Sequence, residues 1–192
     1  ASEPVNYISS RSESLAACLY LATLLCYWRG RRGAALGCFG LGLLVKSVVL
    51  TAPIVLWAGD RWLRGGPYSW RVYAPFGGLG VGYLALISYN RFLTGSLAAP
   101  VRDWTTQFTT QLKVPAFYAQ LVAAPWRLNV EHQFTEAAGW ASTAVWAGGL
   151  FAVSLGAVAW MGRRRMTGFA LIWCAVVLLP TTLMPLNMLV NE

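Results

Sequence analysis

Residues able to bind a phosphate group and move a proton occur between the apolar stretches of this sequence. The cations Arg11 and Lys46 can neutralise phosphate oxygens. Carboxylates and an imidazole, which can act as a general base or position a substrate, accompany them. The candidates for lining such a site are Glu13, Glu131, His132 and Glu192. If these groups lie on one membrane face, their chemistry fits recognition of a lipid phosphate.

Each of these residues also has a structural explanation. Arg11 and Glu13 flank a predicted helix start, where Glu suits the first turn and Arg reaches lipid headgroups. Two residues apart, they do not share a helix face. Lys46 is a lone cation between apolar segments, which is costly unless it meets an anion, so we expect it to be functional. His132 is a lone histidine, the kind more often solvated than catalytic.

The surrounding composition is that of a membrane protein. Of 192 residues, 57% are apolar or aromatic and only 11% are charged, against roughly 25% charged in soluble domains. The net charge of +8 comes from short clusters and not from one continuous basic face, which argues against nucleic acid as a partner. The four cysteines lie inside apolar runs without a CxxC pair, so neither a disulfide framework, a metal site nor another cofactor is expected.

The apolar runs predict an all-α, polytopic transmembrane bundle in a single domain over 1–192. About six spans are expected, at 13–28, 33–45, 47–59, 70–89, 141–160 and 167–187. The region 33–59 is ambiguous, because it can form one long helix around Lys46 or two short spans with a turn at Lys46 and Ser47. Length favours one helix, since thirteen residues rise only about 20 Å.

Charge distribution favours two short spans. With two spans, nine of the fifteen basic residues and a single acid, Asp60, fall on one side of the membrane. The basic clusters on that side are Arg29/Arg31/Arg32, Arg61/Arg64/Arg71 and Arg163/Arg164/Arg165. The other six acids all fall on the opposite side. The positive-inside rule therefore predicts that the arginine clusters are cytoplasmic and that Lys46 lies near the outer surface.

The long polar stretch 90–140 is then extracytoplasmic. Within it, Lys113, Gln120 and Arg127 recur every seven residues among apolar positions at helical spacing. We expect an amphipathic helix over 113–128, with Pro115 in its first turn, lying on the outer membrane surface.

Four blocks of sequence in order resemble a known family. They are Glu3-Pro-Val-Asn-Tyr-Ile-Ser-Ser-Arg-Ser-Glu-Ser-Leu-Ala-Ala17, Leu44-Val-Lys-Ser47, Ala124-Pro-Trp-Arg-Leu-Asn-Val-Glu-His132, and Leu178-Leu-Pro-Thr-Thr-Leu-Met-Pro-Leu186 followed by Asn191-Glu192. Together they resemble the membrane region of bacterial tetratricopeptide-repeat proteins related to the transmembrane-and-tetratricopeptide-repeat protein O-mannosyltransferases. Those enzymes belong to the C-type glycosyltransferase superfamily.

The resemblance implies a polyprenyl-phosphate-linked sugar donor, an acceptor protein or glycan, and a site on the extracytoplasmic face of a bacterial inner membrane. It assigns Arg11 and Lys46 to the donor phosphates, and leaves the roles of Glu131 and His132 open. The family's carboxylate base usually lies in a loop before the matching region. The sequence opens at Ala1 without an initiator Met, so we expect an internal piece of a longer chain, inactive alone.

A second reading belongs to another class of protein. The helices can serve as a non-catalytic membrane scaffold that anchors downstream tetratricopeptide repeats or joins a membrane assembly. A transporter is disfavoured, because no acid or histidine lies in the middle of a predicted span to relay protons.

Overall fold

The computed structural model describes residues 8–65, 69–89, 103–124, 137 and 139–183. Within these ranges it contains seven α-helices and no strand, which confirms the all-α prediction there. The α-helices are α2 (Ile8–Trp28), α3 (Arg32–Val45), α4 (Ala52–Gly59), α5 (Trp70–Tyr89), α7 (Trp104–Ala123), α8 (Thr143–Met161) and α9 (Met166–Leu183). A 3-10 turn, η1 (Ser47–Thr51), and a π turn, η2 (Asp60–Arg64), flank α4.

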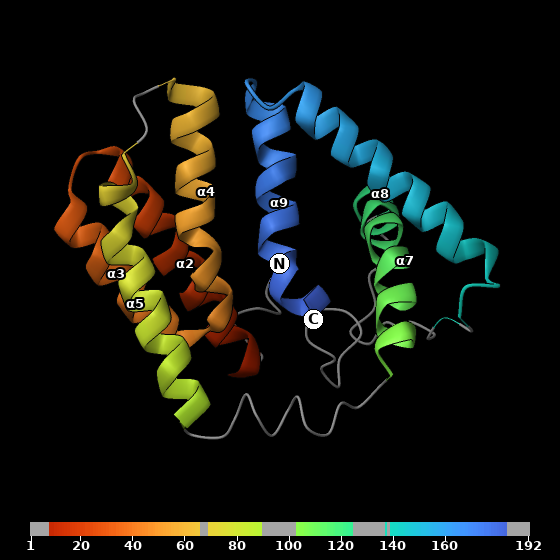
Figure 1. Ribbon diagram of the computed structural model, residues 1–192, viewed down its shortest axis with the longest axis horizontal. Helices are drawn as coiled ribbons and strands as arrows, with labels where there is room; N and C mark the ends of the chain where they lie inside the picture. The colour runs from red at the N-terminus through yellow and green to blue at the C-terminus, as the bar shows by residue number, and fades with distance from the viewer. Residues whose placement is uncertain (1–7, 66–68, 90–102, 125–136, 138, 184–192) are drawn as a thin grey trace.

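Helices α2 and α3 form a hairpin closed by a glycine turn. Gly30 has φ +78°, a left-handed conformation that side-chain-bearing residues rarely adopt. The amides of Gly30 and Arg31 donate to the carbonyls of Tyr27 and Cys26, both at 2.9 Å, and these bonds satisfy the end of α2. The turn brings α3 back along α2 (Figure 1).

The helix is interrupted at Lys46, as the charge distribution predicts. Lys46 is extended, with φ −155° and ψ 136°, and its amide donates to the carbonyl of Gly42 at 2.9 Å. A continuous helical run through η1, α4 and η2 then returns to the other end and continues five residues past the predicted limit of 59. A Cβ on Gly42 would lie 2.9 Å from Val49, so this glycine permits the close approach at the break.

Two of the described helices, α5 and α8, are long and apolar enough to cross a membrane. Helix α3 is apolar but, with fourteen residues, rises only about 21 Å against a hydrocarbon core of about 30 Å. Two such helices are weak evidence for a membrane protein, and a bundle of six spans is not shown.

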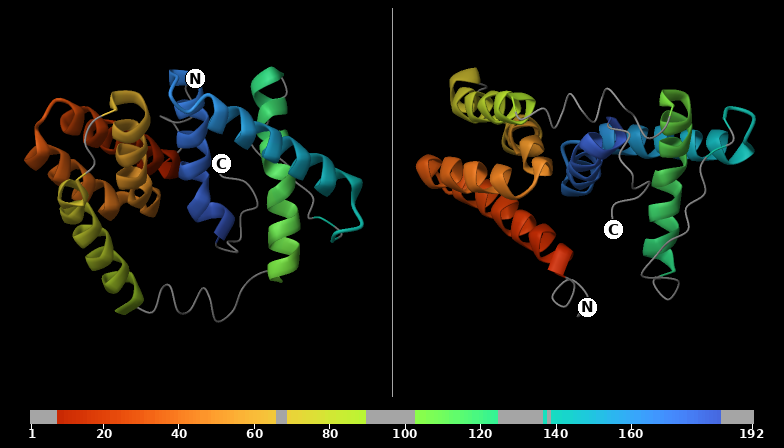
Figure 2. Two further views of the ribbon diagram at one scale, coloured as in Figure 1. Left: turned by 45° about the horizontal axis from the view of Figure 1, so that its top comes forward. Right: turned by 90° about the horizontal axis from the view of Figure 1, so that it is seen from below.

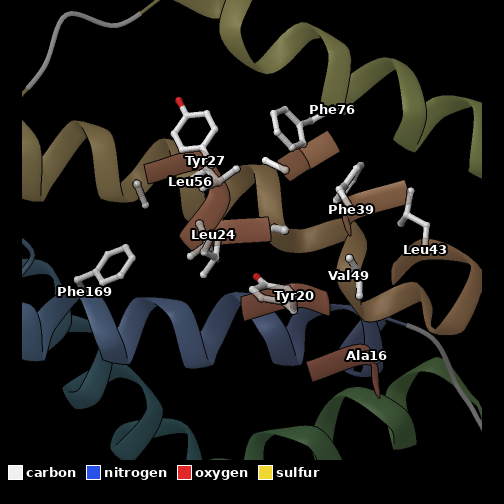
Figure 3. Packing of buried hydrophobic residues seen from close by; sticks show 14 residues of the cluster. Ala16, Tyr20, Leu24, Tyr27, Phe39, Leu43, Val49, Leu56, Phe76 and Phe169 are labelled. Atoms are coloured by element: carbon white, nitrogen blue, oxygen red, sulfur yellow. The ribbon is translucent and has the colours of Figure 1, made fainter. Parts of the chain in front are cut away.

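One apolar core contains residues from all the elements α2 through α5 and from α9 (Figure 3). Leu24, Phe39, Leu56 and Phe76 are almost fully buried in it, and the rings of Phe39 and Phe76 meet edge to face at 5.4 Å. One polar contact crosses it, where the hydroxyl of Tyr20 bonds Thr51 Oγ1 at 3.1 Å. Close-packed residues at these positions fix how the first helices are arranged.

Helix α9 lies between the α2–α5 group and the pair formed by α7 and α8 (Figures 1 and 2). The described parts of the three arginine clusters meet at one end of the bundle. There Arg64 donates to the carbonyl of Trp28 at 3.0 Å, and the rings of Trp62 and Trp160 lie 6.0 Å apart. The charge distribution predicts the same arrangement, with all three arginine clusters at one end.

Helix α7 corrects the expected amphipathic helix. It begins at Trp104 and not near 113, because Asp103 caps it by accepting from the amide of Thr105 at 3.0 Å. Pro115 consequently lies inside the helix and not in its first turn. The helix ends at Ala123, and Arg127 lies outside the described residues.

The N-terminal half of α7, which the sequence did not assign to a helix, buries polar side chains. Its buried residues are mostly polar: Gln107, Thr109, Thr110, Gln111 and Val114. Thr110 Oγ1 accepts a hydrogen bond from the amide of Ala137 at 2.9 Å. Lys113 is half-buried, so of the predicted water-facing residues that are described only Gln120 is exposed. These buried polar residues lie before 113, outside the predicted segment; within it the exposed Gln120 agrees with the prediction and the half-buried Lys113 does not.

Candidate functional site

The cation at the chain break has a carboxylate partner. Lys46 Nζ donates to Glu13 Oε1 and forms an ion pair between the start of α2 and the end of α3. The two side chains are 36% and 43% exposed, so water screens the pair. Glu13 thus supplies the anion that a lone Lys46 requires, from a residue 33 positions away in the sequence.

Arg11 lies in the first turn of α2, two residues before Glu13, and therefore at the end of the helix that carries the Glu13–Lys46 pair. Its side chain is exposed. Of the residues predicted to line a phosphate site, the structure therefore brings Arg11, Glu13 and Lys46 to one end, and Glu13 is the one that contacts Lys46. Glu131, His132 and Glu192 lie outside the described residues.

A second polar cluster, which we call the Asp60 cluster, lies at the opposite end. Tyr27 and Tyr73 each donate a phenol hydrogen bond to Oδ2 of Asp60, at 2.6 and 2.7 Å. Tyr27 comes from the last turn of α2, Asp60 from the start of η2, and Tyr73 from the first turn of α5. Charge-assisted bonds of this kind are among the strongest that proteins form, so the cluster joins three elements.

In the sequence, Asp60 stands out only as the single acid on the predicted basic side of the membrane. Its isolation among arginines is the one feature that indicates a bonded carboxylate. Its partners are tyrosines 33 and 13 positions away, and no spacing rule indicates them. Within the described ranges, no group of three His, Cys, Asp or Glu residues is placed to hold a metal ion.

The two clusters can do different chemistry. Among the described residues at the Glu13–Lys46 end, two cations and one anion are present, and such ammonium and guanidinium groups are suited to a phosphate. At the Asp60 end, phenol donors hold a carboxylate in place. Comparison with protein families, with curated proteins and with solved structures finds no match for this chain.

Proposed function

We propose that the chain forms part of an integral membrane glycosyltransferase. It transfers a mannose-like sugar from a polyprenyl-phosphate donor to a protein or glycan acceptor, on the extracytoplasmic face of a bacterial inner membrane. The proposal starts from the four ordered sequence blocks that resemble C-type glycosyltransferases. One structural observation supports it most directly, the ion pair between Glu13 and Lys46.

That ion pair joins two of the resembling blocks. Glu13 belongs to the block Glu3–Ala17 and Lys46 to the block Leu44–Ser47, which are far apart in sequence. An ammonium group carries three donors, and the bond to Glu13 uses one of them. The remaining donors of Lys46, with Arg11 on the same end, supply cations for the donor phosphate.

Membrane placement is supported by apolar side chains that face outward. Trp146, Leu150, Val153 and Trp160 lie on one face of α8 and are 59–70% exposed. An apolar stripe of this extent is costly in water and favourable against lipid. In the proposed six-span topology, the arginine clusters lie on the cytoplasmic side and the Glu13–Lys46 end faces out.

The scaffold remains the second candidate, because the same ion pair can have a purely structural role. Because Glu13 already neutralises Lys46, the cation has a structural explanation that needs no phosphate. In this reading the helices anchor other domains, and no donor lipid binds at the Glu13–Lys46 end.

Donor-lipid binding distinguishes the two candidates. The purified chain, in uncharged nanodiscs, is titrated with a short-chain polyprenyl-phosphate mannose, with the matching polyprenol as the uncharged probe. We expect Arg11→Gln and Lys46→Gln to weaken binding by roughly ten- to a hundredfold, the value of a lost charged hydrogen bond. Lys46→Arg keeps the charge but not the geometry, so partial loss is expected.

Two further variants complete this test. Arg164→Gln removes an exposed cation from the opposite end and should leave binding unchanged. Glu13→Gln removes the competing anion and should not weaken binding. Equal binding of the phosphate donor and the free polyprenol, or no binding by the unmodified chain, would reject the donor site in favour of the scaffold.

A further inference from the structure

A cavity of about 420 Å³ lies at the arginine-rich end of the bundle. Its walls come from the α2–α3 turn, from η2 and from the start of α5. The charged and polar lining residues are Tyr27, Arg32, Asp60, Arg64, Ser69 and Tyr73. Cavities of this size accommodate small ligands or lipid headgroups, and neither the sequence blocks nor the proposed donor site accounts for this one.

The cavity carries the donors needed for one phosphate group. Two arginines line it, Arg32 from the start of α3 and Arg64 from the end of η2. Arg64 donates to the carbonyl of Trp28 through Nη2, which holds the side chain and leaves its other N–H groups. Arg32 also begins α3, whose first turn has no side-chain cap, so the helix dipole adds positive potential there.

Asp60 supplies a different function in the same cavity. Both phenols donate to its Oδ2, so Oδ1 remains to accept a hydrogen bond from a ligand. A carboxylate repels a bare phosphate but binds hydroxyl groups well. The lining thus combines two arginines, which can bind a phosphate, with a carboxylate that can accept from hydroxyl groups. Ser69 belongs to the same lining.

A lipid fits this position better than a soluble phosphate. The cavity lies at the helix ends, beside Trp70, whose side chain is 64% exposed at the start of α5. Exposed tryptophans at helix ends are typical of the membrane interface. Basic pockets between helices on the cytoplasmic side are typical binding sites for anionic headgroups.

We propose that this cavity binds the headgroup of an anionic phospholipid that carries both a phosphate diester and hydroxyl groups, the chemistry of phosphatidylglycerol. Arg32 and Arg64 hold the phosphate, and Asp60 accepts from a glycerol hydroxyl. The inference needs a membrane around the bundle but not glycosyl transfer, because the cavity residues come from the α2–α3 turn, η2 and the start of α5 and do not include Arg11, Glu13 or Lys46.

Competition binding tests the inference. The purified full chain, in uncharged detergent, is loaded with a fluorescent phosphatidylglycerol, which is then displaced by unlabelled short-chain lipids. Phosphatidylglycerol should compete best, phosphatidic acid more weakly because it lacks the glycerol hydroxyls, and phosphatidylcholine least. Inorganic phosphate and glycerol phosphate should not compete at the same concentration. Equal competition by these soluble compounds or by phosphatidylcholine would overturn the proposal.

Charge-matched variants locate the binding site. Arg32→Gln and Arg64→Gln should each weaken phosphatidylglycerol binding by roughly tenfold, while Arg61→Gln, an exposed residue of the same π turn outside the cavity lining, should stay within about twofold. An equal loss in all three would show general charge attraction and reject the site.

The role of Asp60 has its own readout. Asp60→Asn should abolish the preference for phosphatidylglycerol over phosphatidic acid. If that variant does not fold, Ser69→Ala, at an exposed position in the same lining, should reduce the preference. An unchanged preference in a folded variant rejects hydroxyl recognition. None of these variants touches Arg11 or Lys46, so failure here and failure of donor binding are separate results.

Discussion

Glu13 and Asp60 are both carboxylates that join α2 to later elements, and they do so at opposite ends of that helix. Glu13 meets one partner, Lys46, in a pair that is more than one-third exposed. Asp60 accepts from two phenols, and one of them, Tyr27, is buried. About 21 Å of α2 separates the two ends, given fourteen residues from Glu13 to Tyr27.

The two carboxylates therefore differ in role: one stabilises the helix packing, and the other leaves its partner cation available to a ligand. An exposed ion pair contributes little to stability, because water competes for both charges. Its cation therefore keeps most of its capacity to bind a further anion. A carboxylate held by two phenols contributes more to the fold, because breaking it strands several groups at once. The comparison predicts that the Glu13–Lys46 pair contributes little to stability and leaves its cation available for a ligand. Asp60 stabilises the fold through Oδ2, and only its other oxygen, with Arg32 and Arg64, is available to the proposed lipid.

The largest expected effect is an all-or-none difference in labelling between the two sides of the membrane. With the native cysteines replaced, cysteines at Ser69 and Arg164 should resist an impermeant maleimide in intact cells and react after permeabilisation. A cysteine at Thr105, exposed at the start of α7, should react at once. The arginine-rich end and α7 lie on opposite sides in the predicted topology. Labelling of Ser69 but not Arg164 in intact cells would place the arginine clusters on different sides of the membrane and contradict the comparison of the two ends.

The next effect concerns stability at the Asp60 cluster. Asp60→Ala removes the acceptor of both phenols, so we expect the free energy of unfolding to fall by about 3 kcal/mol. Asp60→Asn keeps an acceptor and should cost less. Unfolding by a denaturing detergent, followed by circular dichroism, measures both. Asp103→Ala is the matched control, since it removes only an exposed helix cap worth about 1 kcal/mol. Similar losses for Asp60 and Asp103 would contradict the stabilising role.

A smaller loss is expected at the turn that brings Arg32 to the same end. Gly30→Ala forces a side chain into a left-handed conformation and should cost about 1–2 kcal/mol. Gly37→Ala, inside α3 and with nothing within 4 Å of the added Cβ, should be neutral or slightly stabilising. Both are measured by the same unfolding assay. A stable Gly30→Ala variant would mean that the turn can relax without moving α3.

The sequence was informative where charge and chain geometry act locally. The break at Lys46 and the shared end of the arginine clusters follow from charge asymmetry alone, and the structure has both. The start of α7 was also readable, because Asp103 precedes a helix-compatible run and caps it. Pro115 is a weaker signal for a helix start, because the helix tolerates it in its interior.

Long-range partners were not predictable in the same way. The bonds from Tyr27 and Tyr73 to Asp60 depend on how α2, η2 and α5 pack, and a tyrosine at a helix end is equally compatible with a membrane interface. The buried polar face of α7 depends on partners outside the helix, such as the amide of Ala137. Hydrophobic periodicity therefore indicated the C-terminal half of the helix but not its N-terminal half, where the buried polar residues lie.

The smallest effect belongs to the Glu13–Lys46 pair. A double-mutant cycle with Glu13→Gln and Lys46→Met should give a coupling of about 0.5 kcal/mol in the unfolding assay, because both side chains are substantially exposed. Added salt should reduce that coupling, since screening acts on exposed pairs. A coupling above about 2 kcal/mol that salt does not change would show that the pair is desolvated. Lys46 would then be committed to Glu13, and the contrast between a weak, exposed pair and a stabilising Asp60 cluster would no longer hold.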